Sequence, residues 1–345
     1  MSSSPALRAA GKPAASPQPS ALVRRWNYLR RICSAYLTSR PSHLTFWHDT
    51  PQANARFRTG ELGDYYMDFP GKADYAGPFD GAGIPLLDYH GVIGRQYNPI
   101  AIAQYGLGNF NLFRNSGEAA RRQRFLLIAA WLRDNLRQNA HGVWVWNHEF
   151  DWDYRTRLIA PWYSGLAQGQ GISVLVRAHQ ETGDAAYLDA AARAFESFRR
   201  TVDAGGVVHV DAEGNRWIEE YLVEPPTHIL NGFLWASWGV YDYWLATRDH
   251  AAKEIFDAAV RTLAGNLRRF DAGFWSLYEI SGTRMPMLAS HFYHALHIVQ
   301  LRIMHRLSGE PVFSEYADRW QAYAASPWRR NRALAYKALF KLLYY

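Results

Sequence analysis

Two glutamates and a tyrosine, Glu219, Glu220 and Tyr221, stand on a proline-broken stretch just before an apolar helical run. Adjacent side chains in an extended segment point to opposite faces, so only one of the two glutamates can face a pocket. A carboxyl group in an apolar pocket can act as a general base or a general acid. A solvated loop with two ion-paired glutamates is the alternative, and the tripeptide alone favours it.

A second group of reactive side chains lies further along the chain. Tyr278 is followed fifteen residues later by Tyr293, which opens a helical run containing His294 and His297. Histidines three residues apart can share a helix face, but hydrolytic zinc helices separate them by four with a glutamate between. We therefore expect buried helix histidines with satisfied hydrogen bonds and predict no metal site. Four aspartates between residues 64 and 80 lack the spacing of a calcium loop and are more typical of turns.

A third segment carries glycines where a helix begins, at Gly165, Gly169 and Gly171. Each glycine costs a helix about 1 kcal/mol relative to alanine, which indicates close approach of another backbone or of a ligand. Tight helix packing is the alternative. The segment lacks the lysine and hydroxyl residue of a phosphate-binding loop.

The elements that must position these residues form a repeat. Short turns at Gly117, Gly183, Asp249 and Gly309 lie 66, 66 and 60 residues apart, and each separates two helical patterns. The first helices are expected near 97–113, 163–181, 227–246 and 288–307, and the second near 118–138, 184–200, 250–269 and 311–324. Four successive hairpins can bury their apolar faces by closing into a ring, so we predict a mainly α fold, an α/α toroid. The long connections 139–161, 201–226 and 270–287 would then share one end.

The pattern outside the repeat predicts three further regions. Residues 1–40 read as a disordered tail and an N-terminal helix. Residues 41–96 have glycine and proline at short intervals between aromatic residues, which indicates a small β-rich cap. The toroid would occupy 97–326 as the catalytic domain, and 327–345 would be a basic amphipathic C-terminal helix that packs on the core.

Composition leaves room for an enzyme core and excludes several classes. The chain has 345 residues, 48% of them hydrophobic, and its one cysteine, Cys33, excludes a disulfide framework. Since no apolar run approaches ~20 residues and no signal peptide is recognised, we expect a soluble, cytoplasmic protein without membrane contact. The net charge of +7 comes mostly from arginine, which pairs well with carboxylates and sulfates. An acidic polymer is a plausible partner, whereas nucleic-acid motifs are missing.

Taken together, the three segments resemble the catalytic helical domain of the heparosan glucuronyl C5-epimerases. The resemblance spans Trp162 to Trp320 and rests on ordered motifs: Trp-Tyr-Ser-Gly-Leu-Ala-Gln-Gly-Gln, Glu-Glu-Tyr, Leu-Asn-Gly-Phe, Leu-Tyr-Glu, Tyr-His-Ala-Leu-His-Ile-Val-Gln-Leu and Pro-Val-Phe. It extends upstream to the run Tyr-Asn-Pro-Ile-Ala-Ile-Ala-Gln-Tyr-Gly-Leu that starts at Tyr97.

The resemblance implies an activity and a set of site residues. Family members convert D-glucuronic acid units of a heparosan-like polysaccharide to L-iduronic acid by removing the hydrogen at carbon 5 and returning one to the opposite face, with no cofactor. The matching catalytic positions are Glu220, Tyr221, Tyr278 and Tyr293. Substrate contacts are expected at Tyr97, Gln104, Tyr105, Trp162, Tyr163, Gln168, Gln170, Arg177, Asn231, Arg284 and His294. The family also implies a homodimer.

One departure concerns the substrate carboxylate. The family places an arginine three residues after the tyrosine that matches Tyr278, whereas this chain has Ser281 there and an arginine only at Arg284. The large animal enzymes also carry a calcium site and a membrane anchor that have no counterpart motif here.

Three other functions fit the same residues. A uronate lyase would pass through the same carbanion and expel the neighbouring glycosidic oxygen. A glycoside hydrolase would use Asp151, Asp153 and Glu220 as its carboxylates. A binding protein would use the 14 tryptophans and many tyrosines to stack on sugars.

Overall fold

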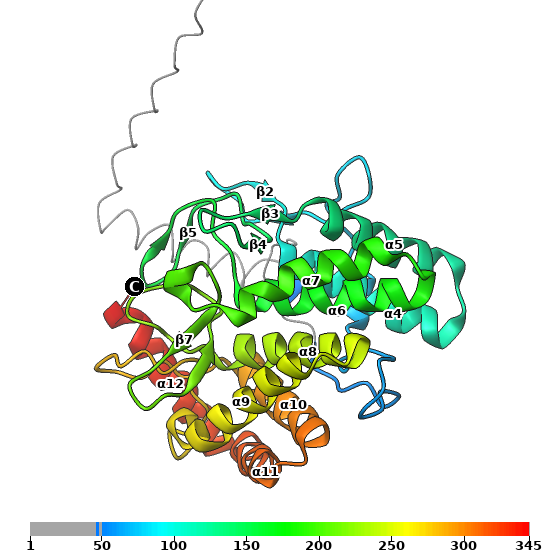
Figure 1. Cartoon of the computed structure of the whole chain (residues 1–345). Coiled ribbons are helices and arrows are strands. Elements are labelled where there is room, and N and C mark those ends of the chain that lie inside the picture. Colours follow the sequence, from blue (N-terminus) through cyan, green and yellow to red (C-terminus); the bar gives the residue numbers. More distant parts are fainter. Residues whose placement is uncertain (1–45, 48–49, 345) are drawn as a thin grey trace, which may run out of the picture.

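The computed structural model describes residues 46–47 and 50–344, so the tail and helix expected over residues 1–40 lie outside the described residues. Four helical hairpins follow one another along the chain (Figure 1). They pair α4 (Pro99–Ser116) with α5 (Ala119–Asp134), α6 (Gly165–Thr182) with α7 (Ala185–Arg199), α8 (Leu230–Thr247) with α9 (His250–Asn266), and α10 (His291–Ser308) with α11 (Pro311–Ala325). The predicted fold class, a mainly α toroid of four hairpins, is confirmed.

Each hairpin turns on one residue in the left-handed conformation. At the first, second and fourth tips this residue is Gly117, Gly183 or Gly309, with φ between 72° and 74°. At the third tip Arg248 adopts φ 59° in place of a glycine, and Asp249 then caps α9 by accepting a hydrogen bond from the backbone two residues on. Glycine thus ends helices and aspartate caps the start of helices at these tips, as the sequence predicts.

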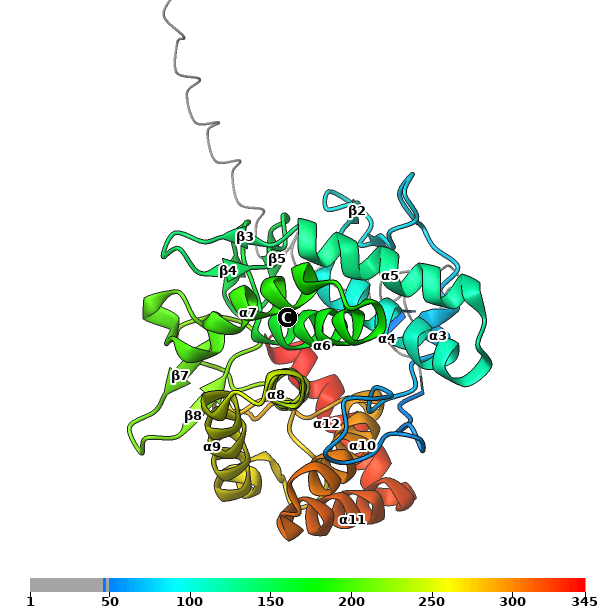
Figure 2. The ribbon, with the colours of Figure 1, turned by 45° about the vertical axis from the view of Figure 1, so that its right-hand side comes forward.

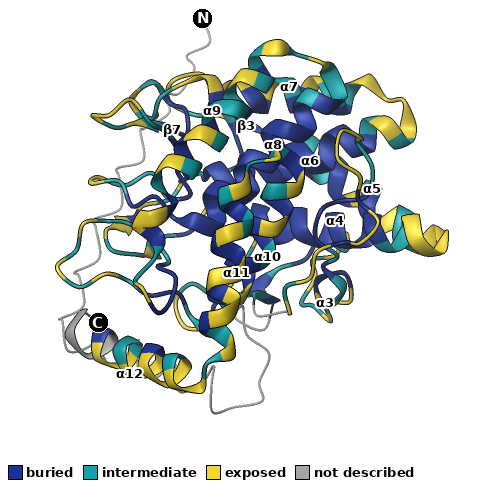
Figure 3. Ribbon diagram, turned by 90° about the horizontal axis from the view of Figure 1, so that it is seen from below, coloured by how far each residue is buried: buried dark blue, intermediate teal, exposed yellow. Residues whose placement is uncertain are grey.

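The first helices of the hairpins form the buried inner layer and the second helices the outer layer (Figure 3). Helices α6 and α8 pack against each other at two glycines, where a Cβ added to Gly239 would lie 2.1 Å from the carbonyl oxygen of Gly169. Gly171 lies against the ring of Trp146 in the same way. The glycines at the start of α6 therefore allow other parts of the protein to approach closely: the backbone of Glu219 at Gly165, the backbone of α8 at Gly169 and the ring of Trp146 at Gly171.

The ring is closed between its first and last hairpins by the segment Ala53–Phe69, which lies between α4 and α10 (Figure 2). On one side, Arg306 of α10 donates to the carbonyl of Phe57 at 2.9 Å, and Thr59 donates to the carbonyl of Arg306. On the other, Asn111 of α4 accepts a hydrogen bond from the backbone of Tyr65 at 2.7 Å. Helix α3 (Pro70–Ala73) and the pair β1 (Leu87–Asp88) and β2 (Arg95–Gln96) follow, among loops.

The long connections carry small antiparallel hairpins at the end of the ring away from the tips (Figure 1). These are β3 (Arg137–Gln138) with β4 (Trp144–Val145), β5 (Trp152–Asp153) with β6 (Arg157–Leu158), and β7 (Val208–Val210) with β8 (Arg216–Ile218). Two short helical turns, η1 (Val202–Ala204) and η2 (Leu267–Phe270), stand beside them. Strand pairs this short have little stability of their own, so the helices on which they pack fix their positions.

The C-terminal helix α12 (Pro327–Tyr344) docks on the toroid, next to the connection 270–287. Tyr336 donates to the carbonyl of Pro286 at 3.0 Å, and Lys337 donates to that of Leu288 at 3.2 Å. Its residue Phe340 is buried. Among the described residues, none of the helices combines the length and apolar character needed to cross a bilayer.

Candidate active site

The loop that leaves β8 carries both glutamates into the protein interior. Glu219 is 2% exposed and Glu220 4% exposed, so the solvated-loop interpretation of this tripeptide is wrong. Glu219 turns to His228, whose backbone N–H and Nδ1 lie 3.1 and 2.5 Å from its two carboxylate oxygens. That pairing secures the loop and leaves Glu220 alone to face the other way, as alternation in an extended segment requires.

Glu220 lies against the first turn of α8. Asn231 donates from its amide to the Glu220 carboxylate at 3.3 Å, and Gly232 leaves room for the same carboxylate. The pKa of Glu220 is raised to about 8: burial is the main cause, the nearby Glu279 carboxylate adds to the shift, and the hydrogen bond from Asn231 opposes it. A carboxyl group with this pKa exchanges a proton readily near neutral pH.

Three tyrosines surround this carboxyl group. The rings of Tyr278 and Tyr293 meet edge to face, with centroids 4.8 Å apart. Burial raises the pKa values of Tyr221 and Tyr278 well above the ordinary value, and next in importance is the charge of Glu220. All three tyrosines are half-buried, so each keeps some surface exposed to solvent. The structure thus brings together Glu220, Tyr221, Tyr278 and Tyr293, the four residues predicted as catalytic.

Hydrogen bonds of the backbone hold Tyr278 and Tyr293 in position near Glu220. The carbonyl of Tyr278 accepts from the backbone N–H of Leu230, the residue that starts α8, at 3.1 Å. Tyr293 stands in the first turn of α10, where the side chain of Ser290 accepts from its N–H and caps the helix. Helices α8 and α10 therefore fix both sides of the cluster.

Sequence reasoning missed three residues beside this cluster. The Glu279 side chain is fully buried, forms an ion pair with Arg155, and accepts hydrogen bonds from Tyr154 and from Ser281. Tyr154 also packs on Tyr221, with ring centroids 4.6 Å apart. Both Tyr154 and Arg155 stand at the turn between β5 and β6. Their only sequence signal was membership of the connection 139–161.

Several predicted substrate-binding residues lie at or near the cluster. Trp162 packs on Tyr221, with centroids 5.7 Å apart, and Asn231 bonds Glu220 directly. The hydroxyl of Tyr163 donates to the carbonyl of Gly205 at 3.0 Å. Arg284 is exposed on the connection before α10, and among the described residues its side chain has no ion-pair partner.

Other predicted substrate-binding residues are buried in the helix layers. Gln168, Arg177 and His294 are at most 1% exposed, and protein groups bind their side chains: Arg177 pairs with Asp242, and His294 with Ser276 and the carbonyl of Trp320. Buried polar groups satisfied in this way are accounted for by the fold.

The remaining predicted contacts are in α4, just before it, or in the neighbouring helix α6. Gln104 donates to Gln170 at 3.0 Å, and both are fully buried. Tyr97 donates to Asp80 at 2.7 Å, and Tyr105 packs against Phe79. These side chains connect helix α4 to helix α6 of the inner layer and to the segment that precedes α4.

The two aspartates that the hydrolase alternative would combine with Glu220 are not buried. Asp151 is 40% exposed and ion-paired with Arg157, and the backbone N–H of Ala160 helps to lower its pKa, the reverse of what a general acid needs. Asp153 is exposed.

Metal ligands are also not grouped in the part of the chain that is described. Over residues 46–47 and 50–344, no three or more histidine, cysteine, aspartate or glutamate side chains converge to hold a metal. Burial lowers the pKa of His294 to about 4, and Ser276 binds both His294 and His297. Both histidines are therefore neutral core residues.

The hairpins form a helical toroid that carries a buried carboxyl–tyrosine cluster at its loop end. The family profile described as D-glucuronyl C5-epimerase C-terminus matches residues 138–322, which contain the whole cluster. The chain belongs to this family.

Individual relatives agree with this assignment. The chain is 35% identical to the D-glucuronyl C5-epimerase of Caenorhabditis elegans over 216 residues, which are 58% of this chain and 35% of that protein. An uncharacterized protein of Methanocaldococcus jannaschii is 29% identical over 52% of this chain and 57% of its own length. The chain thus spans about a third to just over half of these relatives.

Among solved structures, an unsaturated glucuronyl hydrolase specific for heparin superposes with a TM-score of 0.47 and 12% identity, over 66% of this chain and 62% of that one. An unsaturated glucuronyl hydrolase from Bacillus sp. GL1 gives a TM-score of 0.41 and 15% identity, over 68% and 61%.

Proposed function

We propose that this protein epimerises carbon 5 of D-glucuronic acid units in a heparosan-like polysaccharide, giving L-iduronic acid. The observation that carries the proposal is a buried carboxyl group, Glu220, whose pKa is raised to about 8 and which three tyrosines surround. Family membership gives the reaction class. The net charge of +7, mostly from arginine, supports an acidic polymer as substrate.

Inverting carbon 5 needs a proton carrier on each face of the sugar ring. In the proposed reaction the Glu220 carboxylate removes the hydrogen at carbon 5 as a proton, and the electron pair left behind spreads into the adjoining carboxyl group. The Tyr293 hydroxyl then donates a proton to the opposite face. Exchange with solvent returns Glu220 to its carboxylate form and Tyr293 to its hydroxyl form. Nothing is oxidised or reduced.

The negative charge that grows on the substrate's carboxyl group must be stabilised. We assign this role to the hydroxyls of Tyr221 and Tyr278 and to Arg155. The Nε of Arg155 is buried and has no hydrogen-bond partner among the described residues, so one donor of this guanidinium is unused. Arg284, the arginine indicated by the sequence, lies exposed on its loop.

Incubation with heparosan in heavy water tests the proposal. We expect deuterium at carbon 5, iduronic acid in the product and an unchanged chain length. Glu220→Gln should remove the exchange at glucuronic acid. Tyr293→Phe should remove the formation of iduronic acid, since Glu220 can still exchange the hydrogen on its own face, and wild-type rates of epimerisation in either variant would contradict these roles. Unsaturated chain ends would instead identify a lyase, shortened saturated chains a hydrolase, and binding without any change a carbohydrate-binding protein.

A further inference from the structure

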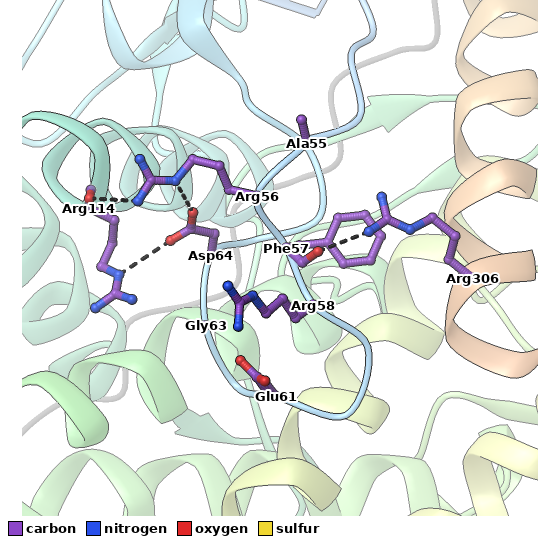
Figure 4. A pocket seen from close by; sticks show the side chains of 9 residues that line it. All are labelled: Ala55, Arg56, Phe57, Arg58, Glu61, Gly63, Asp64, Arg114 and Arg306. Atoms are coloured by element: carbon purple, nitrogen blue, oxygen red, sulfur yellow. Dashed lines mark hydrogen bonds and ion pairs between the residues drawn. The ribbon is translucent and has the colours of Figure 1, made fainter.

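A pocket lies at the opposite end of the ring from the proposed active site. Its volume is about 630 Å³, and it is formed by the segment 55–64 together with Arg114 of α4 and Arg306 of α10 (Figure 4). Arg306 stands 13 residues after Tyr293 on the same helix, which places it roughly 20 Å further along the axis. The pocket is therefore a separate site.

The charge of this pocket is unbalanced. Four arginines line it, Arg56, Arg58, Arg114 and Arg306, against two acidic residues, Glu61 and Asp64, which leaves a formal charge of 4 − 2 = +2. Asp64, only 5% exposed, is already shared by Arg56 at 2.9 Å and Arg114 at 3.3 Å.

The other two arginines form no ion pair with a described acidic residue. The guanidinium of Arg306 lies 3.6 Å from the centre of the Phe57 ring and donates to the Phe57 carbonyl, which is a neutral partner. The side chain of Arg58 is exposed and has no hydrogen bond or ion pair with another described residue (Figure 4). Arginine forks of this kind match carboxylate and sulfate groups in pairs.

The pocket wall is anchored rather than loose. The buried Arg177 donates to the carbonyl of Gly63 at 2.8 Å, and the backbone of Gly60 donates to the hydroxyl of Tyr241 at 3.0 Å. Asn111 and Arg306 hold the two ends of the same segment. A wall fixed in this way loses little conformational entropy when a ligand binds.

We infer that this pocket binds an anionic saccharide carrying carboxylate or sulfate groups, through Arg58 and its neighbouring arginines. Its volume is in the range of pockets for organic ligands and far exceeds that of an inorganic oxyanion. The ligand would be held away from Glu220, so this site binds sugar without acting on it.

Calorimetric titration of the full chain at low salt tests the inference. The probes are a heparosan hexasaccharide, its N-sulfated form, the neutral maltohexaose and inorganic sulfate. All titrations use the Glu220→Gln background to prevent turnover. We expect a class of sites for the anionic hexasaccharides that Arg58→Ala weakens at least about tenfold and Arg58→Glu abolishes. Arg261→Ala, which removes an exposed arginine from α9, should leave it unchanged.

Three results would overturn the inference: hexasaccharide binding unaffected by both Arg58 variants, equal binding of maltohexaose, or Arg58-dependent binding of inorganic sulfate alone. Circular dichroism confirms that the variants fold. Because the readout is binding that depends on Arg58, it is independent of epimerisation. If the wild-type protein shows no deuterium exchange with heparosan but the hexasaccharides still bind in an Arg58-dependent way, only the proposed function is contradicted.

Discussion

Gly232 gives the carboxylate of Glu220 its place: a Cβ on Gly232 would lie 2.2 Å from one carboxylate oxygen. Gly232→Ala should therefore displace the carboxyl group and lower the epimerisation rate by a hundredfold or more, on the order of 3 kcal/mol in the barrier. Gly265→Ala is the matched control, since Gly265 is also in a helix but has nothing within 4 Å of its added Cβ. The control should keep full activity and gain about 0.5–1 kcal/mol of stability. Equal activity in both variants would refute the positional role of Gly232.

The pH dependence of the reaction should report Glu220. Its pKa is raised to about 8, and only the carboxylate form can remove a proton. We expect kcat/KM to rise about tenfold per pH unit from pH 6 and to level off near pH 8. A profile that is already flat at pH 6 would show that another group is the base.

The stability of the fold should show the opposite pH trend at this residue. The pKa of Glu220 is 4.5 when unperturbed and about 8 in the folded protein, so between these values the folded state holds the extra proton. The contribution of Glu220 to the free energy of unfolding therefore falls as pH rises through this window. Glu220→Gln should raise the free energy of unfolding more at pH 8 than at pH 5, by on the order of a few kcal/mol, and the Tm should rise accordingly. Thermal melts that give a pH-independent difference would contradict the burial of an ionisable group.

Arg155 and Arg157 share one hairpin but have different surroundings. Arg155 pairs with the buried Glu279, whereas Arg157 pairs with the half-exposed Asp151. Arg155→Ala should lower kcat by at least about tenfold, because it leaves Glu279 unpaired and removes a donor from the site. Arg157→Ala should change steady-state rates less than twofold. Similar losses in both would mean that the hairpin, rather than the Arg155 charge, matters.

Arg177 was expected to touch substrate, yet it is fully buried and pairs with Asp242 through two hydrogen bonds, at 2.6 and 3.1 Å. Arg177→Gln leaves the buried Asp242 charge without its cationic partner, with the Tyr66 hydroxyl as its remaining donor, so it should destabilise the fold by about 3–5 kcal/mol. Below the melting temperature of the variant, KM should stay within twofold of wild type. A raised KM without loss of stability would restore a substrate role for Arg177.

The helical layers were predictable because local signals repeat. Glycine or aspartate at each tip, with apolar residues at helical spacing, fixed the hairpins to within a few residues of α4 through α11. The third tip departs only in that Arg248 takes the left-handed conformation that glycine takes elsewhere.

The site was predictable only in part. The motifs indicated Glu220 and its tyrosines, but a tripeptide cannot show whether a loop is buried, and both glutamates proved to be inside. Tyr154 and Arg155 stand on a two-residue strand pair whose position depends on the helices beneath it, so no periodicity marks them. Gln168 and His294 lie in the same motifs as the site residues, although their side chains bind protein groups.

The closure of the ring has a consequence for how the chain must assemble. Each hairpin joins neighbouring segments, whereas Thr59 and Phe57 meet Arg306 across 247 and 249 residues of chain. Loop-closure entropy opposes such distant contacts until the intervening hairpins have stacked. During synthesis, the segment Ala53–Phe69 can join α4 early but cannot complete the seam until the fourth hairpin has emerged. The seam therefore forms only after the fourth hairpin is present, and the arginine pocket is complete only when it does.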